Sequence, residues 1–213
     1  IATHGPDSVG FYLSGQLLTE DYYVFNKLAK GLIGTNNVDT NSRLCMSSAV
    51  AGYKATLGAD APPACYDDLD HAELVVIAGS NMAWAHPVLY RRLEDAKARQ
   101  PALRVVCIDP RRTETARAAD LHLPILPGTD VALFNAVLHW LLWEDAVDPA
   151  YIAAHTENFG ALKSMLRECT PAWAARVCGV NEAQIVAFAQ LWRDSAATLS
   201  LYCQGLNQSS SGT

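Results

Sequence analysis

The chain has 213 residues, of which 50% are hydrophobic and 18% are charged, a composition typical of a globular protein with a substantial core. A net charge of −6 with no basic run disfavours nucleic-acid binding, and no apolar stretch reaches the roughly 18 residues of a membrane span. The six cysteines lack C-x-x-C, zinc-finger and iron–sulfur spacing, which favours a reducing compartment, the cytoplasm, over a disulfide scaffold.

The first third of the chain predicts a strand and two helices. Residues 9–14 are apolar and β-prone, and residues 19–34 place apolar side chains at helical spacing behind Thr19 as a capping residue. A loop of turn formers over 35–44 leads to a second helix over 46–57, closed by Gly58.

Strands and helices alternate in the middle of the chain. The apolar runs 74–78 and 105–108 predict strands buried on both faces, and 121–125 predicts a weaker strand. Helices are expected over 87–99 and 131–143, with further helices over 149–195 and a final strand over 198–203. This order predicts an α/β fold, a Rossmann-like parallel sheet with helices on both faces, together with parts of a second α/β domain.

Cys45 lies at the junction between the polar loop and the helix that follows it. A helix N-terminus favours the thiolate, which is the form that binds metals or attacks electrophiles. The plain alternative is a small buried hydrophobic side chain, as most single cysteines are.

Three predicted strand ends carry small or polar turn residues, at the edge where doubly wound folds bind ligands. Gly79, Ser80 and Asn81 suit close approach to a phosphate, and Gly128, Thr129 and Asp130 open a helix. Asp109 suits a ribose or a base edge, and Arg111 and Arg112 suit a pyrophosphate or a purine. Taken singly, each of these segments is also explained as a generic turn, a helix cap or a pair of solvated arginines. Their occurrence at three successive strand ends predicts a nucleotide-type ligand. No G-x-G-x-x-G occurs, so ordinary NAD binding is disfavoured.

An ordered set of motifs extends over nearly the whole chain and resembles the molybdopterin oxidoreductases of the dimethyl sulfoxide reductase family. Within that family the chain is most similar to assimilatory nitrate reductases, with periplasmic ones close behind. The motifs are Gly15-Gln16, Asn41-Ser42-Arg43-Leu44-Cys45-Met46, Gly79-Ser80-Asn81-Met82-Ala83 with His86-Pro87, Asp109-Pro110-Arg111-Arg112-Thr113, Pro127-Gly128-Thr129-Asp130 and Gly205-Leu206-Asn207-Gln208.

The resemblance implies a site for molybdenum carried by two molybdopterin guanine dinucleotides, which reduces nitrate to nitrite with electrons from a donor protein or reductase subunit. Cys45 would ligate the metal and Met46 would line the substrate pocket. The remaining residues would hold the cofactor: Gln16 and Asn41 at pterin or dinucleotide groups; Gly79, Ser80 and Asn81 at a diphosphate; Asp109, Arg111, Arg112 and Thr113 around a guanosine, with Gly128, Thr129 and Asp130 nearby; Gln204 and Gln208 on the metal side.

Several features depart from the family pattern. The four-cysteine motif for a [4Fe–4S] cluster and the C-terminal cofactor-binding domain are absent, and the chain begins without methionine at Ile1. We therefore expect an internal piece of a longer polypeptide, inactive alone. Ser209, Ser210 and Ser211 stand where periplasmic relatives carry an arginine, which favours the assimilatory branch.

Two alternatives stay open, and one domain division is expected. Met46 disfavours a formate dehydrogenase, where histidine follows the ligand, but that enzyme or another family member is one alternative. An isolated nucleotide-binding module without catalysis is the other. Residues 1–43 and 198–213 are expected to form a partial, discontinuous α/β domain, and residues 44–197 the Rossmann-like dinucleotide-binding domain.

Overall fold

The computed structural model describes residues 1–209, for Arg43 the backbone alone, so the predicted roles of Ser210 and Ser211 and the end of the predicted 198–213 segment lie outside the described residues. The chain divides into two compact units. Unit 1 comprises Ile1–Ala61 together with the segment from Leu206 onward, and unit 2 comprises Pro62–Gly205. Within the described range no helix combines the length and apolarity needed to cross a bilayer.

Unit 1 is a small α/β arrangement. Its two short strands, β1 (Phe11–Leu13) and β2 (Val38–Thr40), are parallel, and β2 lies inside the segment that was predicted to be a loop. The helical elements are η1 (Pro6–Ser8), α1 (Thr19–Asn26), the π-helical η2 (Lys27–Ile33), α2 (Ser42–Cys45) and α3 (Ser47–Leu57). The predicted helix over 19–34 is therefore present, with its second half widened into π-helical turns.

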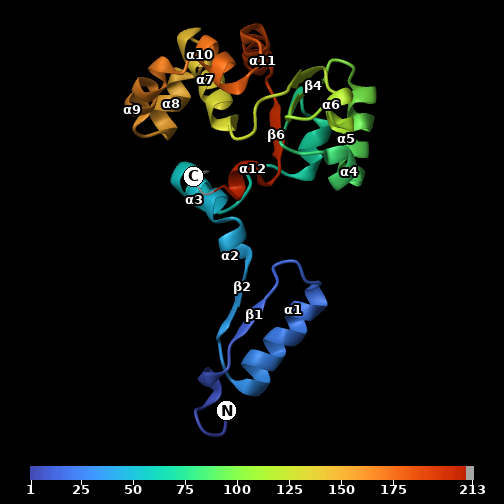
Figure 1. Cartoon of the computed structure of the whole chain (residues 1–213), viewed down its shortest axis with the longest axis vertical. Helices are drawn as coiled ribbons and strands as arrows, with labels where there is room; N and C mark the ends of the chain where they lie inside the picture. Colours follow the sequence, from blue (N-terminus) through green and yellow to red (C-terminus); the bar gives the residue numbers. More distant parts are fainter. Residues whose placement is uncertain (210–213) are drawn as a thin grey trace. The chain divides into compact units, whose positions relative to one another are not determined.

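Unit 2 is built on a four-stranded parallel sheet in the order β5-β4-β3-β6, of which Figure 1 labels β4 and β6. Its strands are β3 (Leu74–Ala78), β4 (Arg104–Ile108), β5 (Leu121–Leu123) and β6 (Thr198–Tyr202). The helical elements are η3 (Tyr66–Asp70), α4 (Met82–Ala85), α5 (Pro87–Arg99), α6 (Glu114–Arg117), α7 (Asp130–Trp143), α8 (Pro149–His155), α9 (Phe159–Met165), η4 (Leu166–Glu168), α10 (Pro171–Cys178) and α11 (Glu182–Asp194). The division between the two units falls within the short helix α12 (Gln204–Asn207).

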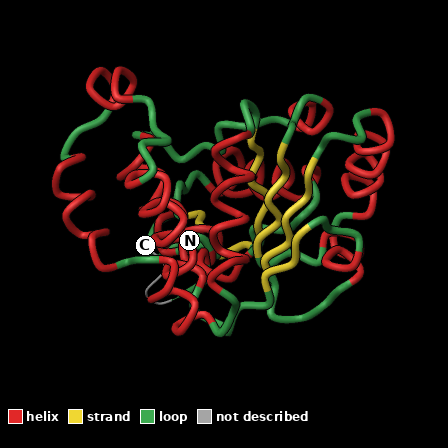
Figure 2. Tube along the Cα trace, turned by 90° about the horizontal axis from the view of Figure 1, so that it is seen from above, coloured by secondary structure: helices red, strands yellow, loops and turns green. Residues whose placement is uncertain are grey.

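Helices cover both faces of this sheet, as Figure 2 shows for the strands drawn in yellow. Successive residues of a strand point to opposite faces. Leu74 and Val76 of β3 therefore pack with α7, α10 and α11, whereas Val75 and Ile77 pack with η3, α4 and α5. The predicted α/β fold and its Rossmann-like parallel sheet are confirmed.

The last strand lies elsewhere than the predicted domain division assumed. β6 is hydrogen-bonded to β3, with Leu74 opposite Thr198, so it completes the sheet of unit 2. The compact units also divide near residues 61 and 205 rather than at 43 and 197. The reason is physical: without β6, the backbone groups of β3 on the side away from β4 would be unpaired, and β6 satisfies them.

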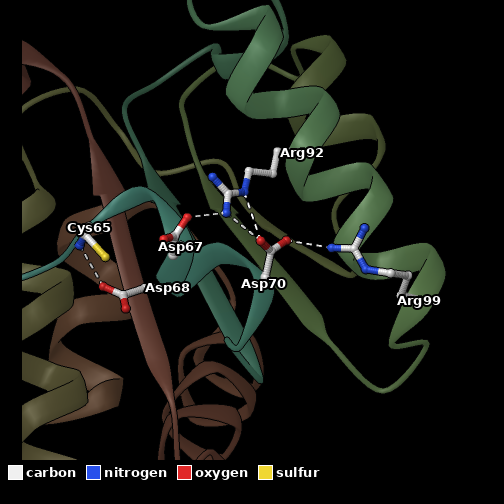
Figure 3. A network of polar contacts seen from close by, with 6 residues as sticks. All are labelled: Cys65, Asp67, Asp68, Asp70, Arg92 and Arg99. Atoms are coloured by element: carbon white, nitrogen blue, oxygen red, sulfur yellow. Dashed lines mark hydrogen bonds and ion pairs between the residues drawn. The ribbon is translucent and has the colours of Figure 1, made fainter.

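A charge network fastens η3 to α5 (Figure 3). Arg92 donates to Asp70 and Asp67 at 2.6 Å each, and Arg99 donates to the second oxygen of Asp70 at 2.6 Å. The hydrogen bond from Arg92 is the main cause that lowers the pKa of Asp70. Because η3 precedes β3, this network lies toward the amino ends of the strands. Arg111 and Arg112, which follow β4 at the carboxyl edge, take no part in it.

Candidate functional site

In unit 1 the parallel pairing of β1 and β2 brings the segments that follow them together. Asn41 Oδ1 accepts a hydrogen bond from the Gly15 backbone N–H at 2.5 Å. A side chain at Gly15 would collide with the Ser42 hydroxyl and would force Ser42 into another rotamer. Gln16 is exposed next to it. The predicted cofactor contacts Gln16 and Asn41 are therefore neighbours.

Cys45 is the last residue of α2, and Met46 is the N-cap of α3, so the predicted loop-to-helix junction is instead a break between two helices. The sulfur is half-buried and accepts a hydrogen bond from Gln208 Nε2 at 2.9 Å. Ser48 holds this returning segment in place through a 2.9 Å hydrogen bond to the Ser209 carbonyl. The structure thus brings together Cys45, the predicted metal ligand, and Gln208, one of the two glutamines that were predicted on the metal side.

A pocket of about 440 Å³ lies beside Met46 in unit 1. The hydroxyl-bearing residues Thr40, Ser42 and Tyr53 and the acidic Asp60 are among its lining residues. Burial, and then the Asp60 charge, raise the pKa of Tyr53, so its hydroxyl stays a neutral donor. The pocket lining is mixed polar and apolar, as ligand sites usually are.

In unit 2 the predicted loops follow β3, β4 and β5 at the carboxyl edge of the sheet. Gly79 and Gly128 have φ values of 59° and 83°, which side-chain-bearing residues rarely adopt. The space that a Cβ atom would enter at either glycine is open to at least 4 Å. Ser80 is buried, and Cys203, after β6, lies 3.5 Å from its hydroxyl. Gln204 is exposed at the start of α12.

Asp109 is only 7% exposed, and its carboxylate is engaged within its own turn. Oδ1 accepts the Arg111 backbone N–H at 2.8 Å, which fixes the turn that carries the two arginines. Burial, with a smaller contribution from Asp109, raises the pKa of the neighbouring Cys107 to about 12, so this thiol is inert.

Arg111 and Arg112 are exposed, and among residues 1–209 neither guanidinium has a carboxylate partner. Arg92 and Arg99, toward the opposite edge, are both paired. Unpaired guanidinium groups after β4, and open glycine backbone after β3 and β5, suit a phosphate-rich ligand.

Two of the predicted threonines have structural roles in the turns. Thr113 caps α6 by accepting the Ala116 N–H at 3.2 Å. Thr129 donates to the Leu126 carbonyl at 2.6 Å, while Asp130 is half-buried at the start of α7. The alternative interpretation of these residues as turn and cap formers therefore has direct support.

The sequence interpretation missed two residues at this edge. Thr115 is 1% exposed and hydrogen-bonded to both Asn81 and Ala83. The His122 ring nitrogen Nε2 lies 2.8 Å from the Asp109 carbonyl and so supports the 109–113 turn. A threonine directly after a predicted binding turn, and a histidine inside a weak strand, were the available signals.

The residues present fit a molybdenum–pterin group in chemical type. Cys45 could supply one soft sulfur ligand, and the Gln208 amide N–H points at its sulfur. Within the described part of the chain, no three His, Cys, Asp or Glu side chains form a competing metal site. The open glycines and unpaired arginines of unit 2 suit the nucleotide arms.

Comparison with known proteins identifies the family. The profile of the molybdopterin oxidoreductase family matches residues 1–213. The chain belongs to the molybdopterin oxidoreductase family. Over 100% of its length it is 52% identical to a nitrate reductase of Shewanella frigidimarina and 49% identical to one of Klebsiella oxytoca, covering 23% and 24% of those proteins.

Two further proteins are similar to this chain, one in sequence and one in fold. An F420-dependent formate dehydrogenase subunit alpha of Methanococcus maripaludis is 37% identical over the whole chain, which covers 31% of that protein. Acetylene hydratase from Pelobacter acetylenicus shares the fold, with a TM-score of 0.78 over 97% of this chain and 28% of its own, at 22% identity. The chain spans about a quarter of the length of the nitrate reductases it matches.

Proposed function

We propose that this chain is part of a molybdenum-dependent nitrate reductase of the assimilatory type. The observation that carries the proposal is the 2.9 Å hydrogen bond between Gln208 and the Cys45 sulfur, which joins the second and last motifs of the family pattern. Identities of 41–52% to three nitrate reductases, against 35% and 37% to two formate dehydrogenases, support nitrate as the substrate.

Cys45 would be the protein ligand of molybdenum in this proposal, and the Gln208 amide would stabilise negative charge on its sulfur. Gln16 and Asn41 would contact the pterin side, and Gln204 would approach the metal-side cofactor. The turns after β3, β4 and β5 would hold guanine dinucleotide through Gly79, Ser80, Asn81, Asp109, Arg111, Arg112, Thr113, Gly128, Thr129 and Asp130. When bound, the molybdenum centre supplies two-electron oxygen-atom transfer.

The chain's own residues would orient the anion and exclude water. Met46 and the pocket beside it offer an apolar wall together with hydroxyl donors from Thr40 and Ser42. Overall, nitrate takes up two electrons and two protons and yields nitrite and water. The electrons would come from a donor protein or reductase subunit, and a [4Fe–4S] cluster is expected only in the longer protein. We place that protein in the cytoplasm, serving nitrate assimilation, and expect residues 1–213 alone to be inactive.

The test is a Cys45→Ser variant of the full-length protein, with Cys65→Ser as the matched control. Cys65 is exposed in unit 2, so its replacement leaves the proposed ligand intact. We expect Cys45→Ser to lose nitrate turnover by a factor of about a hundred or more, in line with the loss of a catalytic group, whereas Cys65→Ser keeps it. Molybdenum and pterin analysis accompanies both assays. Unaltered turnover and metal content in Cys45→Ser would refute the ligand assignment.

Two competing functions are separated by the same preparation. Turnover of formate in place of nitrate would make the protein a formate dehydrogenase, which the similarity to the Methanococcus maripaludis protein keeps in view. Purified full-length protein that lacks molybdenum and pterin but binds guanine nucleotide would instead be a binding module.

A further inference from the structure

Thr115 is a buried hydroxyl that links two of the turns at the carboxyl edge of unit 2. It lies in α6, after β4, and is 1% exposed. Its Oγ1 lies 3.0 Å from the backbone nitrogen of Ala83 and 3.0 Å from Oδ1 of Asn81, both in the segment after β3. A polar atom buried this deeply requires hydrogen-bond partners, because leaving it unpaired costs free energy.

The protons of this cluster can be assigned from donor and acceptor chemistry. A backbone N–H only donates, so Thr115 Oγ1 accepts from Ala83. The single hydroxyl hydrogen of Thr115 then points at Asn81 and requires an acceptor there. The atom of Asn81 that faces Thr115 is therefore its oxygen, and the NH₂ group points away.

In this arrangement the Asn81 side chain does not cap the helix that follows it. Asn81 is the N-cap of α4, where an asparagine side chain normally accepts the N–H of the second or third helical residue. Here Ala83, the second residue, donates to Thr115 instead. Within residues 1–209 the Asn81 NH₂ group has no hydrogen-bond partner, and it belongs to a half-buried side chain beside the open backbone of Gly79.

We propose that Thr115 is a positioning residue that holds the Asn81 amide with its NH₂ group outward, ready to donate to a phosphate oxygen of the bound nucleotide. The inference rests on the proposed nucleotide site, which it deepens by assigning a direction to Asn81. An outward donor selects an acceptor-rich ligand such as a diphosphate, whereas an outward carbonyl would repel it. Without the Thr115 hydroxyl, Asn81 is free to turn and cap α4 itself.

The first test examines the amide orientation by NMR in the full-length protein, prepared without bound cofactor. In wild type, the Asn81 NH₂ protons should show no strong nuclear Overhauser contact with the Thr115 methyl group. In Thr115→Val the amide resonances should move, because Asn81 takes over the cap, while Thr115→Ser should keep the wild-type amide shifts. A strong contact between the NH₂ protons and the Thr115 methyl group in wild type would overturn the inference.

The second test measures the affinity of the same chains for guanosine diphosphate by following these amide signals. We expect Thr115→Val to bind about five- to tenfold more weakly, the loss of one oriented hydrogen bond, and Thr115→Ser to restore binding. The matched control is Thr170→Val, which removes the cap of α10 at Trp173 without touching Asn81 and should leave the affinity unchanged.

The outcomes separate this inference from the proposed function. Equal affinity of wild type and Thr115→Val for guanosine diphosphate would overturn the positioning role. Wild-type protein that does not bind the nucleotide, with the Asn81 orientation as inferred, would instead refute the nucleotide site and with it the ligand assigned here to Asn81. An equal loss of affinity in Thr170→Val would also count against Thr115, because general destabilisation would then explain the effect.

Discussion

Unit 1 and unit 2 support their candidate site residues in different ways. Unit 2 buries two apolar clusters, one on each face of its sheet, beneath the turns that follow β3, β4 and β5. Among the described side chains of residues 1–61, those that are buried are Leu13, Ala29 and Thr35. The turns of unit 2 thus sit on a close-packed support, whereas Cys45 depends on a few hydrogen bonds, including the one from Gln208.

The largest expected effect concerns the core of unit 2. Phe188 of α11 is fully buried between the rings of Phe134 and Trp192, at centroid distances of 6.4 and 5.6 Å. Phe188→Ala should lower the free energy of unfolding of unit 2 by about 3–5 kcal/mol, through lost burial and the cavity left behind. Tyr23→Ala in unit 1, at an exposed side chain, should change the free energy of unfolding of unit 1 by less than about 0.5 kcal/mol. Urea denaturation measures both, and similar losses would erase the contrast between the units.

Native-state hydrogen exchange should separate the units without mutation. α7 buries five of its side chains, whereas α1 buries none. The amides of α7 should therefore exchange about a hundredfold more slowly than those of α1, because α1 opens locally without disrupting a core. Equal protection in the two helices would contradict this expectation.

Two glycines at helix ends sharpen the comparison at single positions. Gly179 ends α10 in unit 2 and Gly58 ends α3 in unit 1, with φ values of 70° and 81°. Gly58→Ala should cost about 1 kcal/mol from backbone strain alone. Gly179→Ala should cost about 2 kcal/mol, because the new methyl group would also lie 3.1 Å from Leu126. Thermal unfolding of the two variants tests the difference, and a larger loss at Gly58 would be the contrary result.

The smallest expected effect depends on pH. Burial by itself raises the pKa of Asp120, but hydrogen bonds from Lys97 and from the Val105 N–H outweigh it, so the pKa is lowered overall. The stabilisation is therefore complete above the ordinary value of about 3.9 and is lost as the pH falls through the lowered one. Asp120→Asn should lower the free energy of unfolding by about 1 kcal/mol at neutral pH, and the difference from wild type should shrink below about pH 4.

The control for this pH experiment is Asp95→Asn, at an exposed carboxylate on the same helix as Lys97. Its stability should follow wild type across the titration. A deficit of Asp120→Asn that stays constant down to pH 2 would show that the ionised carboxylate is not what stabilises the fold.

The sequence predicted the strands of unit 2 well because their signal is local. The apolar runs over 74–78 and 105–108 are too short and too continuous for an amphipathic helix, and both are strands in the structure. β2, by contrast, was assigned to a loop because Val38 stands alone among polar turn formers. Its strand conformation comes from pairing with β1, which is a tertiary effect.

Within the candidate site, the sequence could indicate residue types but not their partners. The turn motifs predicted that Asn81 and Asp109 follow strands, and both do. The hydrogen bond from the Arg111 N–H to Asp109 lies within one turn, but the one that Thr115 donates to Asn81 joins two turns that are 34 residues apart in the sequence. Such a partner follows only from the tertiary structure. The pairing of β6 with β3 is likewise invisible locally, because any strand with a free edge would satisfy the same pattern.

That pairing has a consequence for how the protein is made. Ser80 and Cys203, whose side chains touch just beyond the ends of β3 and β6, are 123 residues apart. A ribosome that adds about 5–20 residues per second therefore needs several seconds after completing β3 before its partner emerges. During that interval the apolar edge of β3 is unpaired in the nascent chain, and we expect a chaperone to be needed most at that stage of synthesis.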